Sequence, residues 1–257
     1  MDEIDAISQH FRRLYPDALG VLTQMRQMRG PALSWPDWCW VPMGATAAYL
    51  VERQGDARDV GALHALTLWR LDRTVLKLDG DSVVEVFSDG ISAADTQEPL
   101  RWRSIETRVL EEAVGRLPSW CPYIAYPPEA QGKGFLSSMR GIWVHREFDV
   151  QTGRPELWIL FDTDGTDAGL VPQSIYLDRP NLGRAVDDML ASTFAGGDQS
   201  GLPHPLSGVL GNVIYGVLPL LLAATHPGFI YPPLPARGGI PSRTTILQQY
   251  RRGLRIS

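Results

Sequence analysis

Cysteine is scarce in this chain, which has two cysteines among 257 residues. Cys39 and Cys121 can form at most one disulfide, and two thiolates alone cannot complete a four-ligand zinc site. The first 14 residues begin with acidic side chains, whereas a secretory signal peptide begins with basic and then apolar ones. We therefore expect a cytoplasmic protein whose thiols are reduced.

The sequence also lacks the motifs of common enzyme classes. It has no Gly-x-Ser-x-Gly nucleophile elbow, no paired-histidine zinc motif and no phosphate-binding loop. The histidines have no metal-ligand spacing, so we assign each of them a surface or capping role: His10, His64, His145, His204 and His226. The sequence thus predicts a non-enzymatic protein with no catalytic residue, no cofactor and no metal.

Positive charge is concentrated at the end of the chain. The net charge is −5, from 24 Lys and Arg against 29 Asp and Glu. Residues 200–257 carry +5 and no acid, so residues 1–199 carry −10, which excludes a uniformly basic nucleic-acid-binding protein. The arginines of the last segment are candidates for contact with RNA or ribosomal phosphates, or with the protein's own acidic body: Arg237, Arg243, Arg251, Arg252 and Arg255.

Hydrophobic periodicity predicts an α+β fold with one domain over residues 1–236 and a short basic tail over 237–257. Residues 1–72 are expected to be mainly helical, and residues 74–236 to form a sheet with further helices. The helices are predicted around residues 4–14, 16–29, 45–54, 59–72 and 104–116.

Alternating apolar residues predict a small, mostly antiparallel sheet. The clearest pattern is a long hairpin over residues 141–163, which turns at residues 151–154. Shorter strands are predicted at residues 75–78, 83–87, 123–126 and 170–177.

Residues 206–225 form an uncharged stretch long enough to cross a bilayer. Its asparagine, proline and glycines, and its two-faced pattern, favour a long buried apolar helix of a soluble core.

An acidic cluster follows the second strand of the predicted hairpin. Clustered carboxylates at a strand end can hold Mg²⁺, so Asp162, Asp164 and Asp167 permit a metal-dependent nuclease or hydrolase. The same residues fit a solvated turn, and we favour the turn because no distant Glu or His is marked as a partner.

Both cysteines follow a proline and a tryptophan in the same order, at residues 36–39 and 118–121. The two Pro-x-Trp-Cys segments fit either two aromatic walls of a peptide or ligand groove, or two buried Trp-Cys pairs at the starts of elements. We favour the buried pairs.

Several blocks resemble the second family of type V-A anti-CRISPR proteins in order and spacing. The blocks are residues 117–124, 141–143, 157–164 and 171–173, with supporting similarity at 69–70, 76–79, 216–221 and 227–231. The chain resembles a short form of that family, without the long basic, aromatic-rich C-terminal extension.

The resemblance implies a non-enzymatic counter-defence protein encoded by a phage, plasmid or other mobile genetic element. Such a protein binds the nascent N-terminal peptide of a target, here the type V-A CRISPR nuclease or another host protein. It then triggers loss of the messenger RNA, with the ribosome or mRNA as indirect partners and no membrane. The alternatives are the metal-dependent nuclease and a plasmid or phage protein-interaction factor.

Peptide binding needs an exposed strand edge or an apolar groove. The hairpin 141–163 is predicted to supply the edge, and polar and aromatic residues to supply contacts: Trp120, Trp143, Trp158, Asp162, Asp164 and Gln173. The two aspartates are placed to meet an N-terminal amine or a basic side chain. Core packing is the alternative for most of the tryptophans.

Overall fold

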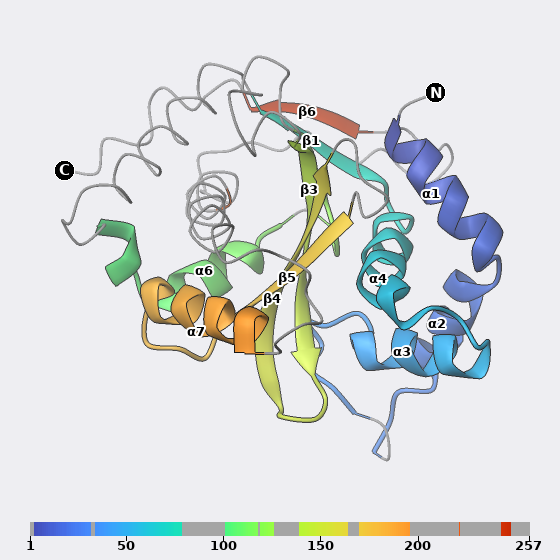
Figure 1. Cartoon of the computed structure of the whole chain (residues 1–257), viewed down its shortest axis with the longest axis horizontal. Helices are drawn as coiled ribbons and strands as arrows, with labels where there is room; N and C mark the ends of the chain where they lie inside the picture. Colours follow the sequence, from blue (N-terminus) through green and yellow to red (C-terminus); the bar gives the residue numbers. More distant parts are fainter. Residues whose placement is uncertain are drawn as a thin grey trace.

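A six-stranded mixed sheet forms the centre of the molecule (Figure 1). The computed structural model describes residues 3–31, 34–78, 101–117, 119–125, 139–163, 170–195, 221 and 243–247. Its strands are β1 (Thr74–Leu78), β2 (Tyr123–Ala125), β3 (Met139–Asp149), β4 (Arg154–Thr163), β5 (Leu170–Tyr176) and β6 (Arg243–Leu247). Their spatial order is β5-β4-β3-β2-β1-β6.

The sheet is antiparallel from β2 to β5 and parallel around β1. Strands β3 and β4 form a hairpin that pairs from Asp149 with Arg154 to Met139 with Thr163. The turn between them includes Gly153 at φ +72°, a left-handed conformation that glycine adopts without strain. The predicted α+β class is confirmed.

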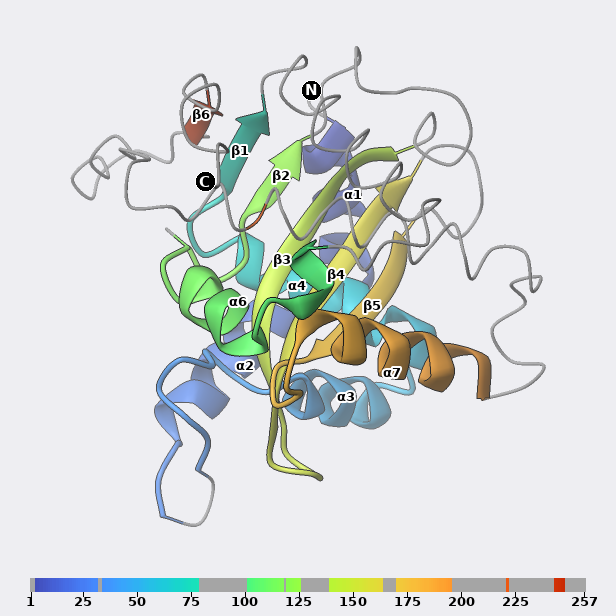
Figure 2. The same cartoon turned by 90° about the vertical axis from the view of Figure 1, so that its left-hand side faces the viewer.

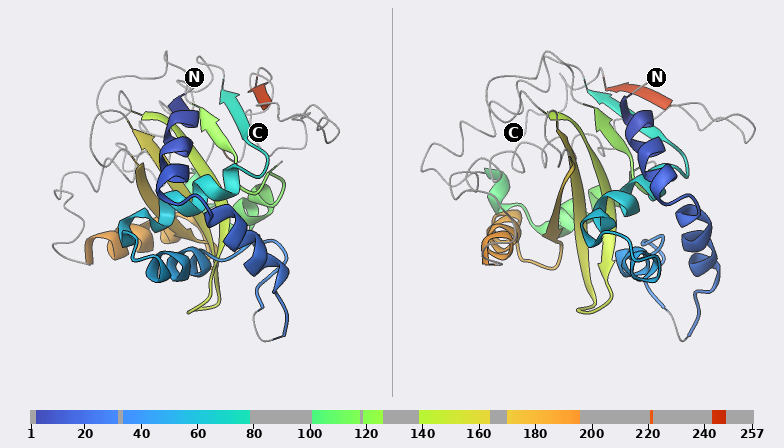
Figure 3. Two further views of the ribbon diagram at one scale, coloured as in Figure 1. Left: turned by 90° about the vertical axis from the view of Figure 1, so that its right-hand side faces the viewer. Right: turned by 45° about the vertical axis from the view of Figure 1, so that its right-hand side comes forward.

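Two layers of helices cover the two faces of the sheet (Figures 1 and 3). One layer contains α1 (Glu3–Leu14), α2 (Ala18–Gln27), α3 (Met43–Glu52), the 3₁₀-helix η1 (Ala57–Asp59) and α4 (Val60–Trp69). On the opposite face lie the 3₁₀-helix η2 (Arg101–Ser104), α6 (Thr107–Val114) and α7 (Leu182–Ala195) (Figure 2). The N-terminal helices follow the sequence prediction.

Strand alternation divides the core between these layers. Trp143 and Leu160 belong to a buried cluster with residues of α1 to α4, including Leu22 and Leu66. Helix α4 is buried at every position from Gly61 to Trp69, because it packs between the sheet and the other helices of its layer. Trp143, His145 and Glu147 of β3, which alternate along the strand, therefore share the face toward α3 and α4.

Helix α7 was not predicted from the sequence. Its buried side chains recur at helical spacing: Leu182, Ala185, Val186 and Met189. Asn181 caps the first turn, since its Oδ1 accepts a hydrogen bond of 2.9 Å from the backbone N–H of Arg184. Both signals were present in the sequence.

Two predicted elements fall wholly or mostly outside the described residues. These are the strand 83–87 and the long apolar helix 206–225, of which only Leu221 is described. Within the predicted basic tail, Arg243–Leu247 forms β6 and pairs in parallel with β1. Among the helices that the structure describes, none combines the length and apolar character needed to cross a bilayer.

Candidate functional site

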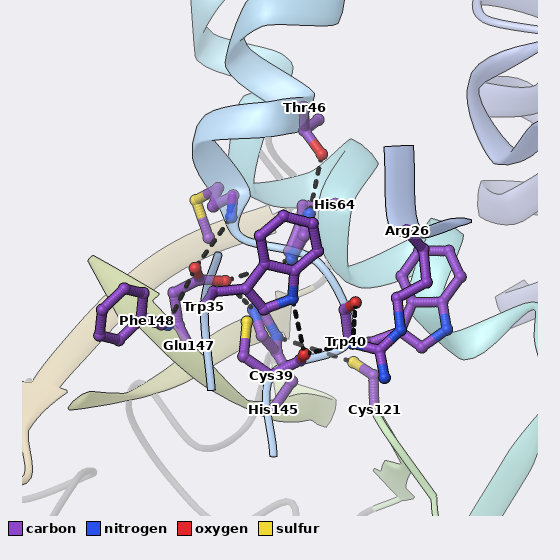
Figure 4. A network of polar contacts seen from close by, with 11 residues as sticks. Arg26, Trp35, Cys39, Trp40, Thr46, His64, Cys121, His145, Glu147 and Phe148 are labelled. Atoms are coloured by element: carbon purple, nitrogen blue, oxygen red, sulfur yellow. Dashed lines mark hydrogen bonds and ion pairs between the residues drawn. The ribbon is translucent and has the colours of Figure 1, made fainter. Parts of the chain in front are cut away.

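Two histidines and a glutamate meet between the sheet and the first helical layer (Figure 4). His145 and Glu147 lie two residues apart on β3 and so share a face, while α4 places His64 opposite them. The exposed fractions of the side chains are 0% for both histidines and 4% for Glu147. Glu147 Oε2 lies 3.2 Å from His64 Nε2 and 3.6 Å from His145 Nε2.

The second carboxylate oxygen of Glu147 is held by the backbone. Oε1 accepts hydrogen bonds from the N–H groups of Met43 at 2.8 Å and Phe148 at 3.0 Å. Met43 is the first residue of α3, so the carboxylate lies at the positive end of that helix. Burial by itself raises the pKa of Glu147, but the facing imidazoles of His145 and His64 outweigh it and lower the pKa to about 2.

The other ring nitrogen of each imidazole, Nδ1, also has a partner. His64 Nδ1 lies 2.8 Å from Thr46 Oγ1, and His145 Nδ1 lies 3.8 Å from Cys121 Sγ. Burial lowers the pKa of His145 to about 4, so its imidazole is neutral at physiological pH. The surface or capping role predicted for His64 and His145 is therefore wrong. The available signal was the His-x-Glu spacing on a predicted strand, which puts both side chains on one face.

Glu156 lies opposite Glu147 across β3 and β4 and is 7% exposed. Burial, with smaller contributions from the charges of Asp149 and Glu147, raises its pKa from 4.5 to about 7. The unfolded chain releases this proton at lower pH than the folded chain does. Stability is therefore lost as pH rises from about 4 to about 7, and the loss is complete above that range.

We expect Glu156→Gln to raise the free energy of unfolding by about 2 kcal/mol near pH 8 and by little near pH 4. The gain at high pH arises because glutamine has no charge to bury. Urea denaturation at the two pH values measures it, with Glu52→Gln at the exposed end of α3 as the control. An equal effect of Glu156→Gln at both pH values would contradict the raised pKa.

The two Pro-x-Trp-Cys segments share one arrangement, with the cysteine inside and the tryptophan under an arginine. Cys39 and Cys121 are buried free thiols. The guanidinium carbon of Arg26 lies 5.6 Å from the ring centre of Trp120, and that of Arg146 lies 4.1 Å from the ring centre of Trp38. The prediction of buried Trp-Cys pairs is wrong for Trp120, which is 39% exposed.

Arg26 joins the two segments. Its Nη1 donates hydrogen bonds to the carbonyl oxygens of Cys39 at 2.7 Å and Trp40 at 2.5 Å (Figure 4). The same guanidinium stacks on Trp120, so it is fixed between residues far apart in the sequence. One turn further along the chain, Arg29 stacks on Trp35 and pairs with Asp37. We call Arg26, Arg29, Trp35, Asp37 and Trp120 the α2-end surface.

A shallow pocket of about 360 Å³ opens on the α2-end surface. It is lined by Arg29, Gly30, Pro31, Ser34 and Asp37. The side chain of Asp37 is 93% exposed, so its carboxylate is accessible from solvent. The pocket thus presents an accessible carboxylate beside the arginine with which it pairs.

Three predicted contact residues lie largely in the interior. Trp143 is 0% exposed and packs edge-on against Tyr123, with ring centres 4.6 Å apart. Trp158 is partly buried against α4, where a Cβ added at Gly61 would lie 3.1 Å from its ring. Gln173 is 6% exposed in β5. The structure therefore fits the alternative of core packing for Trp143 and Trp158.

Asp162 is 1% exposed and is engaged by the sheet's own residues. It accepts hydrogen bonds from the Tyr123 hydroxyl at 2.9 Å and from Arg140 Nε and Nη2 at 3.0 and 2.6 Å. Asp164 and Asp167 lie outside the described residues, as do Arg237, Arg251, Arg252 and Arg255. Arg243 is placed by its backbone only, in β6.

The hairpin 141–163 does not supply a free strand edge, contrary to the prediction. Strand β3 pairs with β2 and β4, and β4 pairs with β3 and β5, so the outer sides of both strands are occupied. Among the described residues, β5 is the edge strand on this side. Its Pro172 fits that position, because proline cannot donate a hydrogen bond to a further strand.

Comparison with known proteins identifies the family that the chain resembles. A model of the AcrVA2-like family, described as the anti-CRISPR type V subtype A2 family, matches residues 92–210. The predicted resemblance is confirmed. The fold is also similar to the crystal structure of AcrVA2, with a TM-score of 0.55 and 22% identity over 88% of this chain and 70% of that one. No curated protein sequence matches the chain.

The AcrVA2-like segment contains only part of the His64–His145–Glu147 cluster and only part of the α2-end surface. Trp120, His145, Glu147 and Asp162 lie within residues 92–210. Arg26 of α2 and His64 of α4 lie before it, as do Arg29, Trp35 and Asp37 in the connection between α2 and α3. Both sites are therefore assembled across the boundary of the AcrVA2-like segment.

Proposed function

We propose that this chain is an anti-CRISPR protein that binds the nascent N-terminal peptide of a target protein and triggers loss of the target's messenger RNA. The AcrVA2-like match over residues 92–210 carries the anti-CRISPR role, and the AcrVA2-like fold supports it. The proposed target is the type V-A CRISPR nuclease, met in the cytoplasm of a bacterial host. The ribosome and mRNA are engaged indirectly, and other host proteins are alternative targets.

The α2-end surface is the proposed peptide-binding surface. A peptide anchor needs a rigid exposed aromatic, because ordering a mobile side chain costs affinity. Trp120 meets this requirement, since the next residue, Cys121, is 0% exposed and Arg26 is held over the ring by two carbonyl oxygens. The carboxylate of Asp37 pairs with Arg29 on one side, but its side chain is 93% exposed and so can also accept a hydrogen bond from the positive N-terminal amine of a peptide.

The function is tested by co-expression with a reporter that carries the first codons of a type V-A nuclease. The leader is left native, recoded synonymously, or recoded to another peptide, and reporter mRNA is measured. We expect mRNA to fall several-fold with the native and synonymous leaders and to stay unchanged with the different peptide, because the peptide is what is recognised. Unchanged mRNA with the native leader would rule out this target.

Trp120→Ala is expected to weaken peptide binding about 30-fold, the usual cost of removing a tryptophan anchor. The melting temperature should change little, since the ring is 39% exposed. Trp120→Phe should retain most of the binding, and Val51→Ala, on the exposed side of α3, serves as the surface control. Titration of a fluorescent leader peptide measures the effect, and unchanged affinity in Trp120→Ala would place the peptide elsewhere.

The nuclease alternative rests on Asp162, Asp164 and Asp167. Asp162 already pairs with Arg140 and Tyr123, and a carboxylate neutralised by a guanidinium is a poor ligand for a hard cation. Magnesium-dependent RNA cleavage by the purified protein, lost in Asp162→Asn with Asp164→Asn, would support that alternative. Absence of cleavage would favour a role carried out through other factors.

A further inference from the structure

We propose that His64, His145 and Glu147 bind one divalent transition-metal ion, zinc, which fastens the first helical layer to the sheet. Each of the three side chains offers a ligand atom, and these atoms all lie within 4.8 Å of one another. His64 Nε2 and His145 Nε2 both lie next to Glu147 Oε2. Two imidazoles and one carboxylate form a donor set that zinc accepts readily.

The spacing of the donor atoms fits a tetrahedral ion. With metal-ligand bonds of about 2.0 to 2.2 Å, two ligands of one tetrahedral zinc lie about 3.4 Å apart. The two distances to Glu147 Oε2, 3.2 Å from His64 Nε2 and 3.6 Å from His145 Nε2, fall on either side of that value. Three protein ligands leave the fourth position to a water molecule.

The inner and outer atoms of the three side chains differ in their partners. The inner atoms, His64 Nε2, His145 Nε2 and Glu147 Oε2, are buried and make no hydrogen bond of standard geometry. Each outer atom is held: His64 Nδ1 by Thr46 Oγ1, His145 Nδ1 by Cys121 Sγ, and Glu147 Oε1 by two backbone N–H groups. Oriented ligands with anchored outer atoms are the usual arrangement around a protein-bound metal.

The hydrogen-bond partners also explain why a cation fits between the inner atoms. A proton on each Nδ1 can be donated to the hydroxyl oxygen of Thr46 and to the sulfur of Cys121. Both Nε2 lone pairs then point at a carboxylate oxygen, and three acceptors facing one another in a buried site repel. A divalent ion converts this repulsion into three coordinate bonds.

The ion would join elements that are distant in the sequence. His64 comes from α4, the other two ligands come from β3, and Glu147 also holds the first N–H of α3. Thr46 of α3 anchors His64 in turn. Metal binding is therefore expected to stabilise the packing of α3 and α4 on the sheet, independently of peptide binding at the α2-end surface.

The first test is metal content and metal-dependent stability of the full chain after removal of any affinity tag. We expect one zinc per chain by elemental analysis, a lower melting temperature after removal of the metal by a chelator, and recovery when zinc is added back. A metal-free chain whose melting temperature does not respond to zinc would overturn the proposal and leave a hydrogen-bonded His-Glu-His triad.

Variants assign the metal to these residues. Glu147→Gln and His64→Gln should lose the zinc, Thr46→Val should weaken zinc affinity about tenfold, and the exposed His10→Gln should retain it. A folded Glu147→Gln chain that keeps one zinc would contradict the proposal. If that variant does not fold, X-ray absorption at the zinc edge of the unsubstituted protein decides. The proposal requires two imidazoles and oxygen ligands around the zinc. A sulfur ligand on the zinc would overturn it.

Discussion

Asp162→Ala is expected to lower the free energy of unfolding by about 3 to 5 kcal/mol, the usual cost of removing one partner of a buried ion pair. Arg140 donates two hydrogen bonds to Asp162, and Tyr123 donates a third. Without the carboxylate, a partly buried guanidinium and a buried phenol lose these bonds in a region from which water is largely excluded. Chemical denaturation monitored by tryptophan fluorescence measures the loss.

A matched pair of variants separates charge from shape at this position. Asp162→Asn keeps the size of the side chain and one acceptor, so its cost should be smaller than that of Asp162→Ala. Arg140→Met added to Asp162→Asn should recover part of the stability, because it removes a partly buried positive charge that has lost its ion pair with Asp162. A cost below about 1 kcal/mol for Asp162→Ala would show that the carboxylate faces water and is accessible to a peptide.

Gly141→Ala is expected to destabilise the fold by about 3 kcal/mol or more through overpacking in the sheet. Gly141 lies between Ala125 of β2 and Asp162 of β4. An added Cβ would overlap the Tyr123 ring and its hydroxyl and would lie 2.6 Å from the Ile124 carbonyl oxygen. Because Gly141 has no side chain, the Tyr123 ring can lie over it on the face of the sheet. The Tyr123 hydroxyl on β2 thereby reaches Asp162 on β4.

The control for this prediction is Gly20→Ala in α2. A Cβ at Gly20 meets no atom within 4 Å, so alanine there should stabilise the helix by about 0.5 to 1 kcal/mol. Thermal unfolding of the two variants compares them directly. Equal melting temperatures for Gly141→Ala and the unsubstituted protein would mean that the Tyr123 ring does not lie over Gly141.

Part of the fold could be predicted from local patterns alone. Alternation over residues 141–163 marked the strands that pair as β3 and β4, and a helical stripe marked α1. Helix α7 carries an equally regular apolar stripe and an asparagine cap, so its position is also encoded by neighbouring residues.

The sites could be predicted less well, because their members come from distant segments. The repeated Pro-x-Trp-Cys segments were visible in the sequence, and the structure shows Arg26 of α2 joining them. Nothing local indicated that His64 of α4 would face His145 of β3. The surface or capping role predicted for His64 and His145 is wrong for that reason.

The sequence by itself determined which elements form and which side chains share a face, since period 3.6 and period 2 are properties of neighbouring residues. It determined the α+β class, the acidic body and the resemblance to the anti-CRISPR family. The tertiary structure alone decided that β3 and β4 are interior strands, that Asp162 is paired with Arg140, and that two histidines converge on Glu147. The physical reason is that packing between layers selects long-range partners, and a local pattern records only the face that is buried.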